Sequence, residues 1–149
     1  MNNASRKFLF TLSLAMLIPL THAKEPTETH EIRSDVMEYI MTNYKAATPA
    51  QRAAAIQYAQ GLQGAMSANP ADSASIQTAK QRLADATQCL YSQFKTERES
   101  GNFRDASRVS FELRNTTLNT QQRLMEYLKF NKAGKSIITS TEEGGCKTI

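Results

Sequence analysis

Apolar side chains recur at three- and four-residue steps over much of the chain after residue 30, which is the spacing of one face of an α-helix. The first such segment begins at about Glu31. Its apolar face consists of Ile32, Val36, Met37, Ile40, Met41 and Tyr44. We therefore expect a first amphipathic helix that buries this face.

The clearest local signal is Thr48-Pro49-Ala50-Gln51, which has the pattern of a helix start. Thr48 can cap the helix, Pro49 suits its first position, and Gln51 completes a capping box. We expect this helix to run to about Ser67 and to end before Asn69-Pro70. One apolar stripe consists of Ala55, Ala59, Leu62 and Met66, and a face of very small residues consists of Ala54, Gly61, Ala65 and Ala68. The small face indicates either tight helix packing, which we favour, or a binding groove.

A third, long helix is expected from Asp72 or Ser73, either of which can cap it. Its near-heptad apolar face consists of Ile76, Ala79, Leu83, Ala86, Leu90 and Phe94. Cys89 lies beside this face, and Ser100-Gly101-Asn102 is the expected stop.

A fourth segment is expected to restart at Asn102, with Asp105 in the first turn. Its apolar positions are Ala106, Val109, Leu113, Thr117, Leu124 and Leu128. These positions fit one helix that continues to about Phe130, although the polar run 115–120 has poor helix propensity. Residues 103–130 therefore form either one bent helix, which we favour, or two helices.

These elements predict an all-α fold, in which residues 24–149 form a single domain, a small antiparallel bundle of three to four helices. The chain has two cysteines, Cys89 and Cys146. In an exported protein this pair favours a disulfide, which would pin the tail 131–149 to the third helix and stabilise the fold by about 4 kcal/mol. The alternatives are unpaired thiols or pairing between two chains. A zinc site is not expected, because His30 is the only histidine after residue 23.

The first 23 residues have the layout of a cleavable signal peptide. Arg6 and Lys7 precede an apolar run from Phe8 to Ile18, which is too short for a comfortable membrane span. Small residues in Thr21-His22-Ala23 predict cleavage between Ala23 and Lys24. We expect export to the periplasm of a Gram-negative bacterium, or secretion from another host, and no membrane span in the mature chain.

Charge does not point to nucleic acid. The chain has 18 Lys and Arg against 14 Asp and Glu, and two of the basic residues lie in the predicted signal peptide. The remaining charges are scattered in both signs, and no basic run is interleaved with aromatic residues. We therefore expect a solvated surface of mixed charge.

Motifs for common enzyme chemistry are absent from the sequence. There is no Gly-x-Ser-x-Gly turn, no phosphate-binding or dinucleotide-binding glycine motif, and no Cys-x-x-Cys. His30 lies near the N-terminus, where we expect a surface residue. We predict no catalytic residue, no cofactor and no metal site.

Two groups of charged residues are candidates for a catalytic or a ligand-binding site. Paired carboxylates can cleave glycans, and the candidates are Glu38, Glu97, Glu99 and Glu112. An anionic ligand could be held by Arg104, Arg108 and Arg114, with Lys95 and Arg98 nearby. Both groups lie in stretches of mixed charge, so we favour a solvated face whose arginines pair with Glu97, Glu99, Asp105 or Glu112.

Two short segments resemble the paired Leu-Thr-x-x-Gln motifs of the periplasmic Spy/CpxP stress-adaptor family. They are Ala47-Thr48-Pro49-Ala50-Gln51 and Leu118-Asn119-Thr120-Gln121-Gln122. The first has Ala in place of Leu and the second has Asn in place of Thr, and the family pattern does not call for the disulfide. The resemblance implies a small ATP-independent chaperone, and we carry over no functional residue from it.

The exclusions and the export signal favour a non-enzymatic protein that binds another protein. Our first hypothesis is an inhibitor or immunity-type protein that occludes a secreted toxin or a cell-wall hydrolase. The second is a periplasmic stress chaperone or adaptor that binds unfolded clients. A hydrolase that uses one of the four carboxylates is a third. The sequence leaves open the partner, the binding surface and the oligomeric state.

Overall fold

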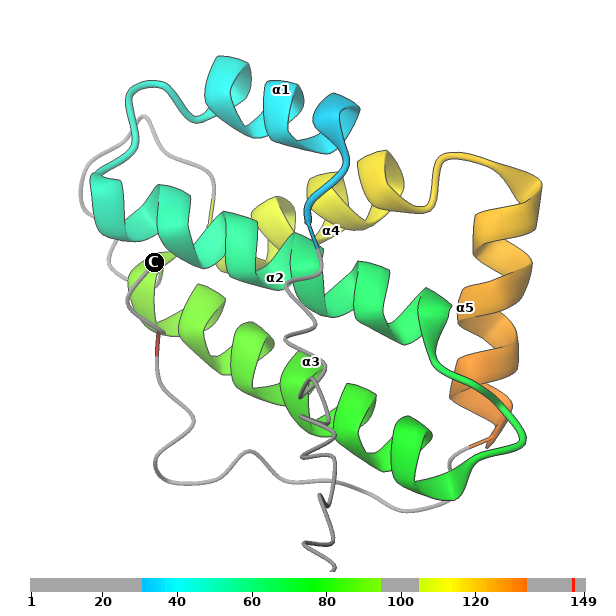
Figure 1. Cartoon of the computed structure of the whole chain (residues 1–149). Coiled ribbons are helices and arrows are strands. Elements are labelled where there is room, and N and C mark those ends of the chain that lie inside the picture. Colours follow the sequence, from blue (N-terminus) through cyan, green and yellow to red (C-terminus); the bar gives the residue numbers. More distant parts are fainter. Residues whose placement is uncertain (1–30, 95–104, 134–145, 147–149) are drawn as a thin grey trace, which may run out of the picture.

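The computed structural model of the chain describes residues 31–94, 105–133 and 146. Within these residues the chain forms five α-helices and no strand. Figure 1 shows how the helices are arranged. The helices are α1 (Ser34–Asn43), α2 (Pro49–Ser67), α3 (Ser73–Phe94), α4 (Ala106–Thr117) and α5 (Gln121–Ala133). The all-α prediction is confirmed for this part of the chain. The expected number of three to four helices is wrong, because the segment predicted as the fourth helix forms two helices, α4 and α5.

Helix α2 lies at the centre of the fold and contacts each of the other four helices (Figure 1). Between Ala54 and Ala65 every residue is buried except Ile56 and Gln60, which are half-buried. A helix that is buried on nearly all sides must be covered on each side by a neighbour. The many alanines and glycines of α2 allow these neighbours to approach closely.

Helix α3 approaches the small-residue face of α2 closely at Gly61. A Cβ atom at position 61 would lie 3.3 Å from both Cα and Cδ1 of Leu83, and 3.4 Å from Cβ of Ala86. The interpretation as tight helix packing is therefore confirmed at this position. Helix α2 also starts as predicted, since Gln51 N–H donates to Thr48 Oγ1 at 3.2 Å and Thr48 N–H donates to Gln51 Oε1 at 3.0 Å.

The disulfide between Cys89 and Cys146 is present and links residues 57 positions apart. Cys89 is buried in the main core, whereas Cys146 is exposed. The main core is formed by buried side chains of α1 to α4 and the turns beside them, and includes Val36, Ile40, Tyr58, Leu62, Leu90, Phe94, Val109 and Leu113. The prediction that Met41 belongs to the apolar face of α1 is wrong, since its side chain is 53% exposed.

Of the two alternatives for residues 103–130, the favoured single bent helix is wrong and the pair of helices is confirmed. Asp105, and not Asn102, caps α4, because its Oδ1 accepts from Arg108 N–H at 2.8 Å; Asn102 lies outside the described residues. Helix α4 ends at Thr117, and Leu118 N–H closes the last turn on the Arg114 carbonyl at 2.8 Å.

Helix α5 then starts beyond a three-residue connection, and Thr120 Oγ1 accepts from the backbone N–H of Arg123 at 3.3 Å. The break changes which residues face the core. Leu124 and Leu128, expected on the buried face, are 45% and 41% exposed, and Phe130 is the buried residue of α5. Asparagine and threonine favour caps over helix interiors, which explains why the chain breaks here.

None of the described helices is long and apolar enough to cross a membrane. The predicted signal peptide 1–23, its cleavage site at Ala23 and Lys24, and His30 lie outside the described residues. Most of the predicted tail 131–149 does as well, apart from the last turn of α5 and Cys146.

Replacing Gly61 by leucine should lower the free energy of unfolding by about 3 kcal/mol, since overpacking a tight core contact forces the neighbours apart. Chemical denaturation of the purified protein measures this change. Ala50→Leu is the matched control, because Ala50 is exposed on the same helix. Equal stability of the two variants would contradict the assignment of Gly61 to the α2–α3 contact.

Candidate functional site

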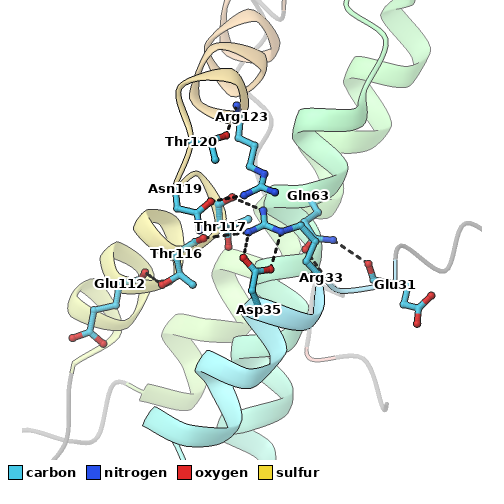
Figure 2. A network of polar contacts seen from close by, with 10 residues as sticks. All are labelled: Glu31, Arg33, Asp35, Gln63, Glu112, Thr116, Thr117, Asn119, Thr120 and Arg123. Atoms are coloured by element: carbon cyan, nitrogen blue, oxygen red, sulfur yellow. Dashed lines mark hydrogen bonds and ion pairs between the residues drawn. The ribbon is translucent and has the colours of Figure 1, made fainter.

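The side chain of Arg33, the residue immediately before α1, extends to the end of α4 (Figure 2). Its Nη1 donates to the Thr117 carbonyl at 2.8 Å, and its Nη2 lies 3.5 Å from the Thr116 carbonyl. The last carbonyls of a helix have no partner within the helix. A cationic donor at this end satisfies them and also interacts favourably with the helix dipole.

Asp35 and Gln63 hold Arg33 in place. Asp35 accepts from Arg33 Nε at 2.9 Å and from Nη2 at 2.6 Å, which is a two-point ion pair. The hydrogen bond from Arg33 holds the pKa of Asp35 below its ordinary value of 3.8. Gln63, on α2, accepts from Arg33 N–H at 2.9 Å and donates to the Glu31 carbonyl at 3.1 Å. We call Arg33, Asp35, Gln63 and the carbonyls of Thr116 and Thr117 the polar junction.

An open depression of about 790 Å³ adjoins this junction, lined by Glu31, Ile32, Arg33, Ser34, Asp35, Met37 and Arg123. The charged side chains that line the depression are of both signs. The side chain of Arg33 donates its hydrogen bonds to Asp35 and to the carbonyls of Thr116 and Thr117, which are parts of the fold. Arg123 donates to the side chain of Asn119 (Figure 2). The buried Oγ1 of Thr117 has no hydrogen-bond partner in the described part of the chain. The junction therefore serves chiefly to join the start of α1, α2 and the α4–α5 corner.

The candidate carboxylates are not brought together. Glu112 is held by two neighbours, since Tyr44 Oη donates to Oε2 at 3.0 Å and Arg108 Nε donates to Oε1 at 3.1 Å. Glu38 is exposed on α1, and Glu97 and Glu99 lie outside the described residues. Among the residues that the structure describes, no three His, Cys, Asp or Glu side chains are placed to hold a metal ion.

The candidate arginines for an anion site that the structure describes, Arg108 and Arg114, make different contacts. Arg108 pairs with Glu112, as the preferred interpretation predicts. Arg114 Nη2 lies 3.4 Å from the hydroxyl of Tyr58, and this hydrogen bond raises the pKa of Arg114. Burial raises the pKa of Tyr58. Arg104, Lys95 and Arg98 lie outside the described residues.

A surface that sequence reasoning missed lies where α3 meets α4. Phe111 is 63% exposed and Tyr91 is 43% exposed. The two are linked through Ser107, whose Oγ lies 3.4 Å from the Tyr91 hydroxyl and which precedes Phe111 by one helical turn. Arg108 and Arg114 lie three residues before and after Phe111. We call Tyr91, Ser107, Arg108, Phe111 and Arg114 the aromatic patch.

A signal for this patch was present in the sequence. The buried residues of α4 are Ala106, Val109, Leu113 and Thr117. Phe111 falls two residues after Val109 and two before Leu113, so it points away from that face. A large aromatic residue out of phase with a helix's apolar stripe is expected on the surface.

Comparisons with protein-family models, with curated proteins and with solved structures return no match. The two segments that resemble the Spy/CpxP motifs differ in structure. Thr48 and Gln51 form a capping box at the start of α2. In the second segment Thr120, and not Asn119, accepts the capping hydrogen bond, so the cap is one residue later than in the motif.

Replacing Arg33 by alanine should lower the free energy of unfolding by about 2–3 kcal/mol, because it leaves the carbonyls at the end of α4 without their donor. Thermal and urea unfolding measure the loss. Thr117→Val is the matched control: it removes the unpartnered hydroxyl and keeps the carbonyl that Arg33 binds, so stability should stay equal or rise. A smaller loss for Arg33→Ala than for Thr117→Val would contradict this role.

The Arg33–Asp35 pair should make stability depend on pH at acid values. Because the pKa of Asp35 is lower in the folded protein than in the unfolded chain, its contribution is present above its ordinary value of 3.8 and is lost as pH falls through the folded pKa. The difference in stability between the wild type and Asp35→Asn should be constant near neutral pH and shrink below about pH 4. Unfolding series at stepped pH measure it, and a difference that grows on acidification would contradict the pairing.

Proposed function

We propose that this protein is a small, exported, non-enzymatic protein that binds another protein through the aromatic patch. In this proposal it acts as an inhibitor or immunity-type protein and occludes a secreted toxin or a cell-wall hydrolase. The observation that carries the proposal is the exposure of Phe111 on α4 and of Tyr91 on α3, where the Tyr91 hydroxyl meets Ser107, one helical turn before Phe111.

The composition of the patch supports a protein partner. Tyrosine, phenylalanine and arginine are enriched in the centres of protein interfaces, and a few such residues supply most of the binding energy. Phe111 offers an apolar anchor. The side chain of Arg108, three residues before Phe111, is 67% exposed. Its Nε donates to Glu112, and the exposed guanidinium can also meet an acidic group of the partner.

The patch is also held rigidly, which lowers the entropic cost of binding. Val109 and Leu113, on the opposite side of α4, are fully buried. Tyr91 is two residues from Cys89, where the disulfide joins the C-terminal part of the chain to α3. An occluding protein needs such a preformed surface and no reactive group.

Phe111→Ala should lower the affinity for a captured partner by about 30-fold or more, as expected for the loss of an interface anchor. The partner is first captured from periplasmic and secreted extracts with the disulfide-bonded protein, and its affinity is then measured with purified components. Met41→Ala is the matched control, because Met41 is an exposed apolar residue on α1, a helix that contributes no residue to the patch. One stoichiometric partner that binds both variants equally would contradict the patch, and recovery of many loosely held proteins would contradict the inhibitor.

A chaperone or adaptor is the second candidate function. The observation that favours it is the spread of exposed apolar side chains over three places: Met41 on α1, the aromatic patch, and Leu124, Met125 and Leu128 on α5. Flexible methionines suit binding to varied apolar segments. This candidate requires that the protein slows the aggregation of unrelated unfolded clients, and that no single substitution abolishes the effect.

A further inference from the structure

The outer face of α5 combines apolar and basic side chains. Leu124, Met125 and Leu128 are 45%, 49% and 41% exposed. Successive residues of a helix are about 100° apart, so these three side chains lie within about 100° of one another. The opposite side of α5 is turned to the protein, where Phe130 is buried and Tyr127 is half-buried.

The charged side chains on the outer face of α5 are basic. Lys132 falls within the arc of the three apolar side chains, and Lys129 falls beside Met125, so both are on the outer face. Both lysines are exposed. The acidic residue of α5, Glu126, points toward the inner edge, is half-buried, and accepts from Gln122 Nε2 at 3.0 Å. The surface that matches this face is therefore anionic and takes up apolar side chains.

The shape of the region favours a lipid surface over a protein segment. Helix α5 lies at one end of the molecule and packs against α2 and α3 (Figure 1). Its outer face is the convex surface of a single helix. A partner helix would need a groove between elements, whereas an interfacial helix lies flat on the lipid headgroups with its leucines below and its lysines at the phosphates.

We propose that α5 is a peripheral membrane contact, which inserts Leu124, Met125 and Leu128 into an anionic phospholipid surface and pairs Lys129 and Lys132 with lipid phosphates. This contact does not depend on the aromatic patch, which lies on α3 and α4. It would hold an exported protein at the membrane surface without a spanning helix.

The test uses a tryptophan reporter, because the sequence contains no tryptophan. Leu128→Trp in the protein starting at Lys24 places the probe on the outer face of α5, and this chain keeps every described helix and both cysteines. Vesicles of phosphatidylglycerol and phosphatidylcholine should shift the emission to shorter wavelength, and vesicles of phosphatidylcholine alone should not. Added salt should reverse the binding, because it screens the lysines.

Reversing the charge of the two lysines of α5 then tests whether the outer face of α5 is the one that binds the vesicles. Lys129→Glu with Lys132→Glu, in the Leu128→Trp protein, should weaken vesicle binding by about tenfold or more. Lys45→Glu with Arg82→Glu is the matched control, since it makes the same change in net charge at exposed positions on other elements. Circular dichroism confirms that both variants are folded.

Equal weakening by the two charge-reversal pairs would overturn the assignment of the contact to α5. Absence of a shift with anionic vesicles at low salt would overturn the lipid contact itself. If, in that case, the α5 pair weakened capture of an acidic protein, the outer face would belong to a protein partner. Neither result would alter the Phe111→Ala test of the proposed function.

Discussion

The last carbonyls of α4 must find hydrogen-bond donors outside their own helix, because the helix ends at Thr117. Arg33 supplies these donors from the start of α1, and Asp35 and Gln63 fix its position. One side chain thus ties three parts of the chain at a single corner. Helix α5 starts beyond the three-residue connection that follows this corner, and it packs against α2 and α3.

The central position of α2 imposes a second constraint. Its small residues let α3 approach until no space remains for a Cβ at Gly61. The large side chains that fill the core therefore come mostly from the surrounding helices and from Tyr58 and Leu62 of α2. This arrangement leaves α4 and α5 at the outside of the molecule, each with an apolar residue or group that has no place in the core.

The two outer surfaces differ in chemistry, and this difference separates the two proposals. The aromatic patch offers rings and guanidinium groups on rigid helices, which suits a protein interface. The outer face of α5 offers leucine, methionine and lysine on one convex helix, which suits lipid. Taken together, the two proposals are that the protein binds a partner and does so near a membrane, and neither proposal requires a catalytic group.

Local chemistry in the sequence determined the helix starts at Thr48 and Asp72, the buried face of α3, and the pairing of Cys89 with Cys146. Each depends on neighbours within a few residues or on a choice between only two cysteines. The sequence left open whether residues 103–130 form one helix or two, and the tertiary structure decided for two helices and left Leu124 and Leu128 exposed. The polar run 115–120 favours a break, and Arg33, 84 positions from Thr117, binds the end of α4 at this break. Such a distant donor leaves no periodic signal in the sequence, so only the folded chain reveals it.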